Sequence, residues 1–379
     1  MLAIVERFAK RSRGAAGCAR GASARSRRHR AIGVVLEALE NRILLTWIGA
    51  LTGNTNDAAH QYNNVANWSS GVIEDSFVGA TFTGNTTLFF TASHTTGAGG
   101  LNLGYGGSFS LTFMSSSPTT ETLTLGGDIS AGVANQTVTI GDVSGADDLN
   151  VALGAAGRTF NTASGQTLAV VNVISGADTL TAAGSGTLTL SGINTYSTGT
   201  TLSSGQLDIN SVRAVGTGNL TINGGTIDNT SGAAVAYTSN ITQTWGGDFT
   251  FLGSNSLNMG TGAVTLGDNR TVTVSAATLT EGGIIGGAFS LTKAGTGTLT
   301  LSGANTFSGG TTLSAGQLDI NSATAIGSGT FTINGGTIDN TSAAAITLSD
   351  NNVEVWGGDF TFVGTKSLNL GTGTVTLGS

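Results

Sequence analysis

The amino-acid sequence predicts an all-β fold, a right-handed parallel β-helix (β-solenoid), and three observations support this prediction. Among 379 residues, 60 are glycine and one is proline, while 39% are hydrophobic and 10% are charged. A disordered chain would hold fewer apolar residues and more charge. Short runs place an apolar residue at every second position, as half-buried strands do. A long segment also recurs without a gap, which is typical of stacked turns.

The amino-terminal segment differs in composition from the remainder of the chain. Residues 1–46 hold ten of the fifteen Lys and Arg side chains and the single cysteine, Cys18. This basic leader lacks a packable apolar face, so we expect it to be disordered or helical. The rest of the chain carries 5 basic and 19 acidic groups, a net charge of −14, which disfavours nucleic-acid binding. With one cysteine in the leader, no disulfide framework is expected in the body.

The end of the leader carries a short, distinctive motif. Leu36–Thr46 reads LEALENRILLT. This run resembles the LEPR-XLL amino-terminal domain, with Asn41 where that family has proline. The family heads many large bacterial surface and exported proteins, after a similar basic stretch. The resemblance therefore implies an exported, envelope-associated product whose leader carries sorting information.

The body of the chain is built from repeats. Residues 178–268 align with residues 289–379 at a constant offset of 111, with 61 identities in 91 positions. The body therefore divides into an amino-terminal solenoid region (47–177), a first repeat unit (178–288) and a second, incomplete unit (289–379). The second unit ends about one turn short of the first, so its last turn should expose apolar side chains and unpaired backbone groups. We expect self-association through that turn.

Each unit contains short alternating runs separated by Gly-Gly, Asn-Gly or Ser-Gly pairs, which favour tight turns. A sandwich or a barrel could also use such strands. A gapless repeat favours stacked turns, because each turn must then add the same length. At roughly 22 residues per turn, one unit makes about five turns and residues 47–379 make about 15. In the first unit we expect strands at Thr187–Leu190, Gln206–Ile209, Asn219–Ile222, Asp248–Phe251, Ala263–Leu266 and Thr271–Val274.

Two stretches inside the units carry a family resemblance. Residues 291–313 read LTKAGTGTLTLSGANTFSGGTTL and resemble the autotransporter-associated β-strand repeat, also called the passenger-associated transport repeat. Residues 180–202 match it again, with Ala182 where the family has lysine. Trp47 to Gly49, followed by residues 66–69, also resembles the opening of such passengers. The resemblance implies a secreted or surface-displayed parallel β-helix, and it carries no catalytic residues.

Residues that could support catalysis are sparse. The body has two histidines, His60 and His94, which we expect in solvent-facing loops because no spaced pair or cysteine suggests a zinc site. Asp147–Asp148 is an adjacent acidic pair, and Arg270 follows Asp268 closely. A glycosidase requires two carboxylates across one cleft, and the sequence indicates no such cleft. We therefore expect no catalytic, cofactor-binding or metal-binding residues.

Two periodic features allow more than one interpretation. Trp245 and Trp356 either pack against a corner of the solenoid or provide stacking platforms for sugars. A set of regularly spaced aspartates should point outward. These side chains form either a solvated face that discourages edge pairing or, if the turns stack in register, a column that binds Ca²⁺. The set comprises Asp208, Asp228 and Asp248 in the first unit, and Asp319, Asp339 and Asp359 in the second.

Two functions remain compatible with the sequence. The first is a non-catalytic, secreted or surface-displayed solenoid passenger that is structural or adhesin-like. The alternative is a carbohydrate-active β-helix enzyme of the polysaccharide lyase or hydrolase type. Repetition favours the first, because an enzyme has one unique cluster whereas this chain repeats its polar positions. The expected partners are surface glycans or other cells, together with a membrane-embedded transporter supplied elsewhere, and the expected location is the cell surface or outer envelope.

Overall fold

The chain divides into two compact units, Met1–Ile43 and Leu44–Ser379, and each is described by itself. In the first unit, β1 (Ala38–Leu39) pairs antiparallel with β2 (Arg42–Ile43). The disorder or helix expected for the rest of the leader lies outside the described residues. The structure is a computed structural model that describes residues 38–39, 42–43, 86–90, 93–103, 111–115, 120–132, 136–142, 148–238 and 240–378.

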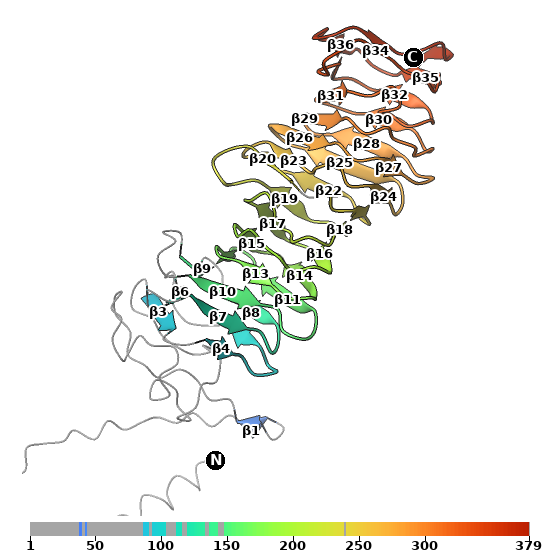
Figure 1. Cartoon of the computed structure of the whole chain (residues 1–379). Helices are drawn as coiled ribbons and strands as arrows, with labels where there is room; N and C mark the ends of the chain where they lie inside the picture. The colour runs from blue at the N-terminus through green and yellow to red at the C-terminus, as the bar shows by residue number, and fades with distance from the viewer. Residues whose placement is uncertain are drawn as a thin grey trace, which may run out of the picture. The chain divides into compact units, whose positions relative to one another are not determined.

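The second unit is a parallel β-solenoid, as predicted, whose strands stack turn upon turn (Figure 1). One sheet of 14 strands runs through it and receives one strand from every turn. These strands define 13 steps, which span about 62 Å at about 4.8 Å per step. From Thr86 to Val375 the average step is about 22 residues, which agrees with the expected turn length. The strands of this sheet are β3 (Thr86–Phe90), β6 (Leu111–Ser115), β9 (Thr137–Ile140), β12 (Thr167–Val170), β15 (Thr187–Leu190), β17 (Gln206–Ile209), β19 (Thr226–Asp228), β22 (Phe249–Phe251), β25 (Arg270–Val274), β28 (Leu291–Ala294), β30 (Thr311–Leu313), β32 (Phe331–Ile333), β35 (Glu354–Trp356) and β38 (Val375–Leu377).

Shorter sheets form the other two sides of the solenoid. On the first side, which precedes the 14-strand sheet in each turn, lie nine strands: β5 (Leu101–Asn102), β8 (Ile129–Ala131), β11 (Arg158–Thr162), β14 (Thr179–Gly184), β16 (Gly199–Leu202), β18 (Asn219–Ile222), β21 (Gln243–Trp245), β24 (Val264–Leu266) and β27 (Ile285–Gly286). The third side begins with four strands: β4 (His94–Thr95), β7 (Glu121–Thr124), β10 (Leu149–Ala152) and β13 (Ile174–Ser175). It ends with seven: β20 (Val235–Ala236), β23 (Leu257–Asn258), β26 (Thr278–Glu281), β29 (Thr298–Leu301), β31 (Gln317–Ile320), β33 (Thr337–Asp339) and β36 (Thr361–Phe362).

Both shorter sides contain stretches without regular strands, where backbone hydrogen bonds continue the stack. On the third side, Thr195 N–H donates to Ile174 and Thr217 N–H to Tyr196, between the four-strand and seven-strand sheets. On the first side, Thr306 N–H donates to Ile285 beyond the nine-strand sheet. The first side then closes with the two-strand sheet of β34 (Ile346–Thr347) and β37 (Leu368–Asn369).

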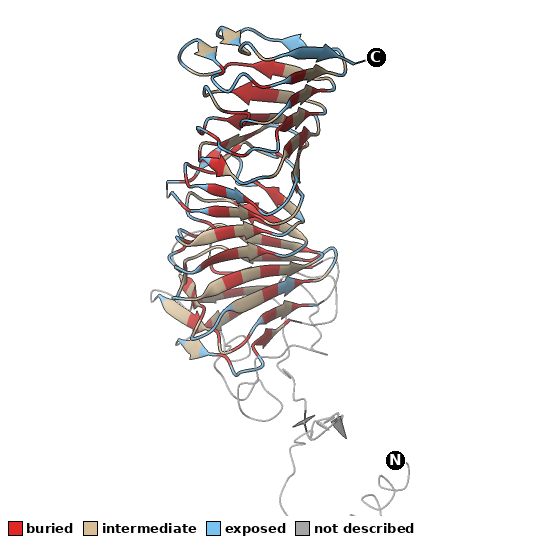
Figure 2. Ribbon diagram, turned by 90° about the vertical axis from the view of Figure 1, so that its right-hand side faces the viewer, coloured by how far each residue is buried: buried red, intermediate tan, exposed pale blue. Residues whose placement is uncertain are grey.

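The core follows from the two-residue alternation of each strand. In β15, Leu188 and Leu190 point inward and are buried, while Thr187 and Thr189 are half-buried on the outside. Figure 2 shows buried segments alternating with partly exposed ones through the stacked turns. Full burial of an aliphatic side chain contributes roughly 1.5–3 kcal/mol, so the interior ladder is the main source of stability. The six strands expected in the first unit all occur, with three of them shifted by one residue at the first position.

The two repeat units place equivalent residues on different sides of the solenoid. β15 of the first unit lies in the 14-strand sheet, whereas its copy β29 lies in the seven-strand sheet. Likewise β18 lies in the nine-strand sheet and its copy β32 in the 14-strand sheet. From β15 to β28 the chain makes five turns, and one further side leads to β29. The repeat therefore covers five turns and a third, where the sequence predicted about five.

Unequal turn lengths cause this rotation. The register pairs Thr187 with Gln206 in one turn and Thr226 with Thr250 in another, so the second of these turns contains more residues. The 111 residues of one repeat do not make a whole number of turns. The second unit is therefore rotated by one side relative to the first. Columns that continue between units in the sequence alignment do not continue in space.

The turn at the carboxyl-terminal end of the described residues is exposed. In β38, Leu377 is 72% exposed and Val375 is 44% exposed. Figure 2 shows this last turn in the colour of exposed residues. The self-association expected through this turn stays a prediction. Within the described parts of the chain, no helix is long and apolar enough to cross a membrane.

Candidate functional site

The repeated aspartates form two pairs and not one column. Asp208 of β17 lies opposite Asp228 of β19 in the 14-strand sheet. Their copies, Asp319 of β31 and Asp339 of β33, lie opposite each other in the seven-strand sheet. The aspartates therefore do not form the column that stacking in register would have produced. Thr226 pairs with Thr250, so Asp248 is out of register with Asp228, and the second unit is rotated by one side.

The third aspartate of each set lies outside its pair. Asp248 precedes β22 and Asp359 precedes β36, and both are exposed. Asp248 accepts a hydrogen bond from Thr271 N–H at 2.9 Å. Its Oδ1 also lies 3.7 Å from Nη1 of Arg270, whose Nε donates to the Trp245 carbonyl. These exposed aspartates belong to corners of the solenoid.

The paired aspartates are buried, which corrects the expectation of a solvated face. Asp208 is 5% exposed and Asp228 is 1% exposed. Oδ1 of Asp208 accepts a hydrogen bond from Gln206 Nε2 at 2.7 Å, and Oδ2 accepts from Thr189 at 3.0 Å and Thr230 at 3.2 Å. Burial raises the pKa of Asp208, the three hydrogen bonds lower it in part, and the charge of Asp228 raises it further.

Asp228 connects its own turn to the next one. Its Oδ1 accepts hydrogen bonds from the backbone N–H of Asn229 at 2.8 Å and of Ser254 at 2.9 Å, and its Oδ2 accepts from the Ser254 hydroxyl. Asp339 makes the same contacts with Asn340 and Thr365. The donors to these carboxylates are therefore groups of the protein itself, including Ser254 after β22 and Thr365 after β36.

The calcium interpretation of the aspartates loses its geometric basis. A calcium ion takes six to eight oxygen ligands, supplied from carboxylates free to coordinate it. Here protein donors already occupy both oxygens of Asp208 and Asp228. Among the described residues, no group of three or more His, Cys, Asp or Glu side chains is placed to hold a metal ion.

The two tryptophans belong to the interior of the solenoid. Trp245 is fully buried, its Nε1 donates to Gln243 Oε1 at 3.2 Å, and its ring meets Phe249 edge to face at 5.2 Å. The packing interpretation is confirmed for Trp245, and the sugar-platform interpretation is wrong for it. Trp356 repeats the contact with Phe360 at 5.2 Å but is half-buried. It lines a cavity of about 670 Å³ at the last turn, together with residues 357–360, Leu377 and Gly378.

Lys293 is a buried cation that binds backbone carbonyls, and no acid among the described residues pairs with it. Its place in β28 points inward, and the side chain is fully buried. Burial lowers the pKa of the Lys293 ammonium to about 8. Its Nζ donates to the carbonyl oxygens of Ala294 at 2.8 Å, Gly295 at 2.9 Å and Ala315 at 3.1 Å. The lysine typical of the repeat therefore closes a corner of the solenoid.

The first unit satisfies the same corner by another route. Ala182 stands where the second unit has Lys293, and Ser204 stands where it has Ala315. The Ser204 hydroxyl donates to the carbonyl of Gly184 at 2.8 Å. Gly184 is the counterpart of Gly295, so a serine hydroxyl replaces the lysine ammonium at this carbonyl.

We expect this exchange to be measurable as a coupling. Lys293→Ala should destabilise the protein by about 1–2 kcal/mol, because buried carbonyls lose their donor. Ala315→Ser should regain about 1 kcal/mol in the Lys293→Ala background and nothing in the wild type. Urea unfolding of the four proteins at pH 7 gives the cycle, and additive effects would contradict the shared role.

In the wild type, stability should also rise between pH 8 and 10.5, where the unfolded chain binds more protons.

The remaining sequence candidates do not converge. His94 lies in β4, half-buried beside the ring of Phe90 at 6.4 Å, and not in a solvent-facing loop. Asp148 accepts a hydrogen bond from the side-chain amide of Asn172. His60 and Asp147 lie outside the described residues. Of the acidic candidates, Asp268 is exposed near Arg270, which binds Asp248 and the backbone.

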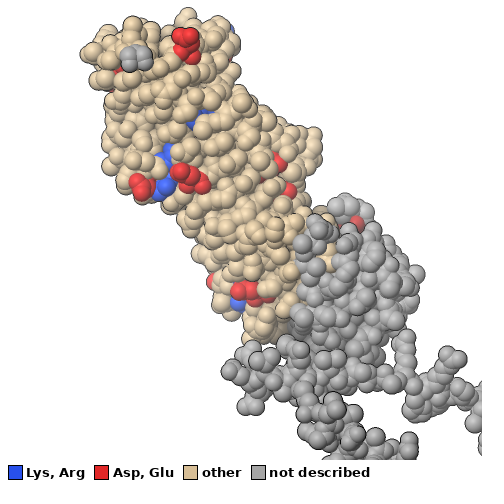
Figure 3. Space-filling view, turned by 180° about the vertical axis from the view of Figure 1, so that it is seen from behind, with Lys and Arg blue, Asp and Glu red and all other residues tan. Residues whose placement is uncertain are grey.

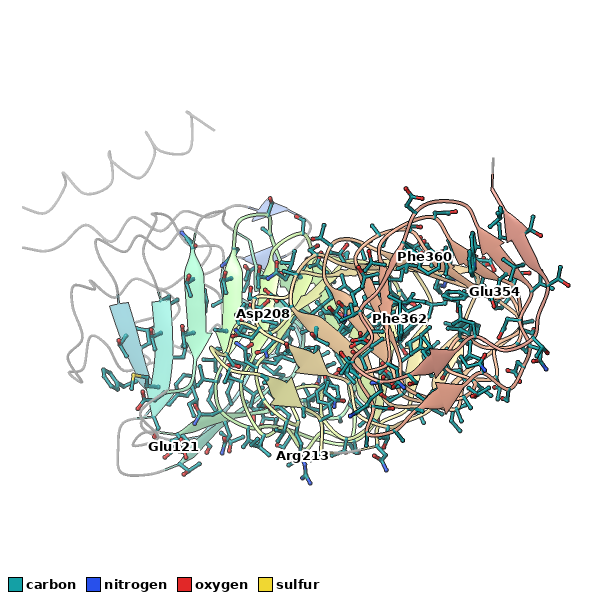
Figure 4. All side chains as sticks on the ribbon, turned by 90° about the horizontal axis from the view of Figure 1, so that it is seen from above. Glu121, Asp208, Arg213, Glu354, Phe360 and Phe362 are labelled. Atoms are coloured by element: carbon teal, nitrogen blue, oxygen red, sulfur yellow. The ribbon has the colours of Figure 1, made fainter. Side chains whose placement is uncertain are left out.

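Charged side chains are sparse on the face shown in Figure 3, where small groups of them interrupt an otherwise uncharged surface. Arg213 is exposed and its side chain points away from the ribbon (Figure 4). In the same view, Glu354, Phe360 and Phe362 lie in the turns near the carboxyl-terminal end.

One acid inside the core was not predicted from the sequence. Glu281 occupies the last position of β26 and is 1% exposed. Burial raises its pKa to about 7, while hydrogen bonds from Gly283 N–H and Gln243 lower it in part. The two-residue alternation of the strand could have revealed it, because Glu281 falls on the same face as the inward-pointing Leu279. Val170 occupies the same inward position in β12.

Comparisons with known proteins agree with the repeat architecture. Residues 180–209 and 291–320 match the passenger-associated transport repeat family. An alignment 126 residues long, which covers 31% of this chain, is 35% identical to the adhesin BmaC autotransporter of Brucella suis biovar 1 (strain 1330). That alignment spans 4% of the adhesin's length. No solved structure shows a significant match to this chain. The chain is thus an autotransporter passenger-like β-solenoid with distant similarity to an adhesin.

Proposed function

We propose that this solenoid is a non-catalytic, adhesin-like passenger that is secreted or displayed on the bacterial surface. The observation that carries the proposal is the pair of passenger-associated transport repeats, each of which forms four strands of an unbroken parallel stack. The distant similarity to an autotransporter adhesin adds support. The repeated aspartates accept hydrogen bonds from adjacent turns, Asp208 from Thr189 and Asp228 from Ser254, and such bonds stiffen a scaffold.

The outer surface is the part that would meet a partner. Asn210 and Thr230 are joined by side-chain hydrogen bonds one turn apart, and Asn321 and Thr341 repeat the arrangement. Because of the rotation between units, the two ladders lie on adjacent sides of the solenoid. Amide and hydroxyl groups of this kind suit neutral glycans, so surface glycans or other cells are the proposed partners. A membrane-embedded transporter supplied by another chain is the proposed export route, and the LEPR-XLL-like leader is the proposed sorting signal.

Surface display can be tested with a single introduced cysteine. In a Cys18→Ser background, Arg213→Cys should react with a membrane-impermeant maleimide on intact cells, because residue 213 is exposed. Val215→Cys is the matched control, since Val215 is 1% exposed and should react only after unfolding. If Arg213→Cys were labelled only in lysed cells and not in intact cells, surface display would be contradicted.

Adhesion needs a separate measurement. Beads coated with the folded full-length protein should bind glycan-bearing cell surfaces several-fold above beads coated with the urea-unfolded chain, and soluble protein should compete. Equal binding by both kinds of bead would contradict the adhesin role without affecting surface display. The same preparation, incubated with neutral and acidic polysaccharides, should release no new reducing ends, and release would favour the carbohydrate-active alternative.

A further inference from the structure

The interior of the solenoid contains a polar cluster that the proposed function does not use. Glu281 reaches across the core from the seven-strand sheet to Gln243 in the nine-strand sheet, and Gln243 Nε2 donates to its Oε2 at 2.8 Å. Gly283 N–H donates to the other carboxylate oxygen at 2.8 Å. Gln243 Oε1 in turn accepts from Trp245 Nε1. The cluster therefore joins two sides of the solenoid through one carboxyl group.

The surroundings of Glu281 offer no compensating positive charge among the described residues. It lies in register with Leu301 of the next turn, and burial is the largest influence on its carboxyl group, ahead of its two hydrogen bonds. The titratable groups that share this interior are Tyr237 and Tyr196. Burial raises the pKa of Tyr237 strongly, and the charges of Tyr196 and Glu281 raise it further. The buried Tyr237 hydroxyl has no hydrogen-bond partner in the described part of the chain. An ionised carboxylate here is thus poorly solvated.

We propose that Glu281 makes the middle of the solenoid responsive to pH. While the side chain is a neutral acid, it fits the apolar interior and holds two sides together. Once it has lost its proton, the buried charge favours opening of the turns around β26. The expected direction follows from proton linkage: the folded state keeps this proton to about pH 7, and the unfolded chain releases it near pH 4.5. Stability conferred by Glu281 is therefore complete below pH 4.5 and declines as the pH rises towards 7.

Glu281 occupies an inward strand position that holds an apolar residue in the corresponding strand β12. β12 and β26 share the same inward and outward pattern, and Val170 holds the place of Glu281 in β12. The fold therefore accommodates an apolar residue at this point, which supplies a natural replacement. Two variants follow: Glu281→Gln keeps the size and the hydrogen-bonding capacity, and Glu281→Val reproduces the residue found in β12.

Hydrogen exchange in the full-length protein tests the proposal. In the wild type, the opening equilibrium of amides in β21, β24, β26 and β29, corrected for intrinsic exchange rates, should rise on the order of 100-fold between pH 4.5 and pH 8. In Glu281→Gln the rise should be less than about 3-fold. The turn around β12 serves as an internal reference in every sample, because the buried Val170 stands there in the place of Glu281.

The controls separate this effect from a general loss of stability. Asp268→Asn removes an exposed acid from an adjacent turn and should leave the pH response of β26 unchanged. If Glu281→Gln folds poorly, Glu281→Val provides the second variant, and infrared detection of a protonated carboxyl at pH 6 in the wild type provides a direct measurement. A wild-type response that survives in both variants, or a carboxyl already ionised at pH 5, would overturn the proposal. Neither outcome would bear on surface display or adhesion.

Discussion

Trp245→Ala is expected to destabilise the turns around β21 by about 3–5 kcal/mol, the usual effect of removing a buried aromatic side chain. Trp245 is fully buried, so truncation opens a large space in the core. It also removes the edge-to-face contact with Phe249 and leaves Gln243 Oε1 without its indole donor. Urea unfolding together with hydrogen exchange should show the loss, because solenoids can open turn by turn.

The second unit supplies the matched control for Trp245. Trp356 has the same neighbours in sequence and the same contact with Phe360, but it is half-buried. Trp356→Ala should therefore be less than half as destabilising, and its effect should be confined to β32 and β35. Equal losses for the two variants would show that burial does not decide the difference between them.

Asp228→Ala is the second change with a large expected effect, a loss of about 2–4 kcal/mol, because several buried groups lose one acceptor at once. These groups are the backbone N–H of Asn229 and of Ser254, together with the Ser254 hydroxyl. Asp228→Asn keeps one acceptor oxygen and should fall between wild type and alanine. Thermal unfolding at pH 7, in chelator and in millimolar calcium, should give the same ranking.

Asp248→Ala is the control for the aspartate prediction. Asp248 belongs to the same sequence set, but its side chain is 61% exposed and its contact with Arg270 is 3.7 Å long. Exposed ion pairs contribute little, so a loss of no more than about 1 kcal/mol is expected. If Asp248→Ala proved as destabilising as Asp228→Ala, the distinction between buried pairs and exposed corners would be wrong.

Strand positions were predictable because they depend on local pattern. The Thr-Leu-Thr-Leu run of β15 fixes which side chains face inward, since successive residues of a strand point to opposite faces. The positions of Gly205 and Gly316, both at positive φ, mark turns for the same local reason. The burial of Asp208 was not predictable in this way. Alternation places it outward, and the side chain of Thr230 from the following loop then covers it.

By itself, the sequence determined the parallel solenoid, the average turn length and the two repeat units. Each of these follows from short-range alternation and from identity at a fixed offset. Only the tertiary structure decided which side of the solenoid each repeat occupies and which acids are buried. The side depends on the summed lengths of all preceding turns, so small differences in turn length rotate Asp319 away from Asp208. The burial of Glu281 depends on side chains that meet across the core from two sheets, although they lie far apart in the chain.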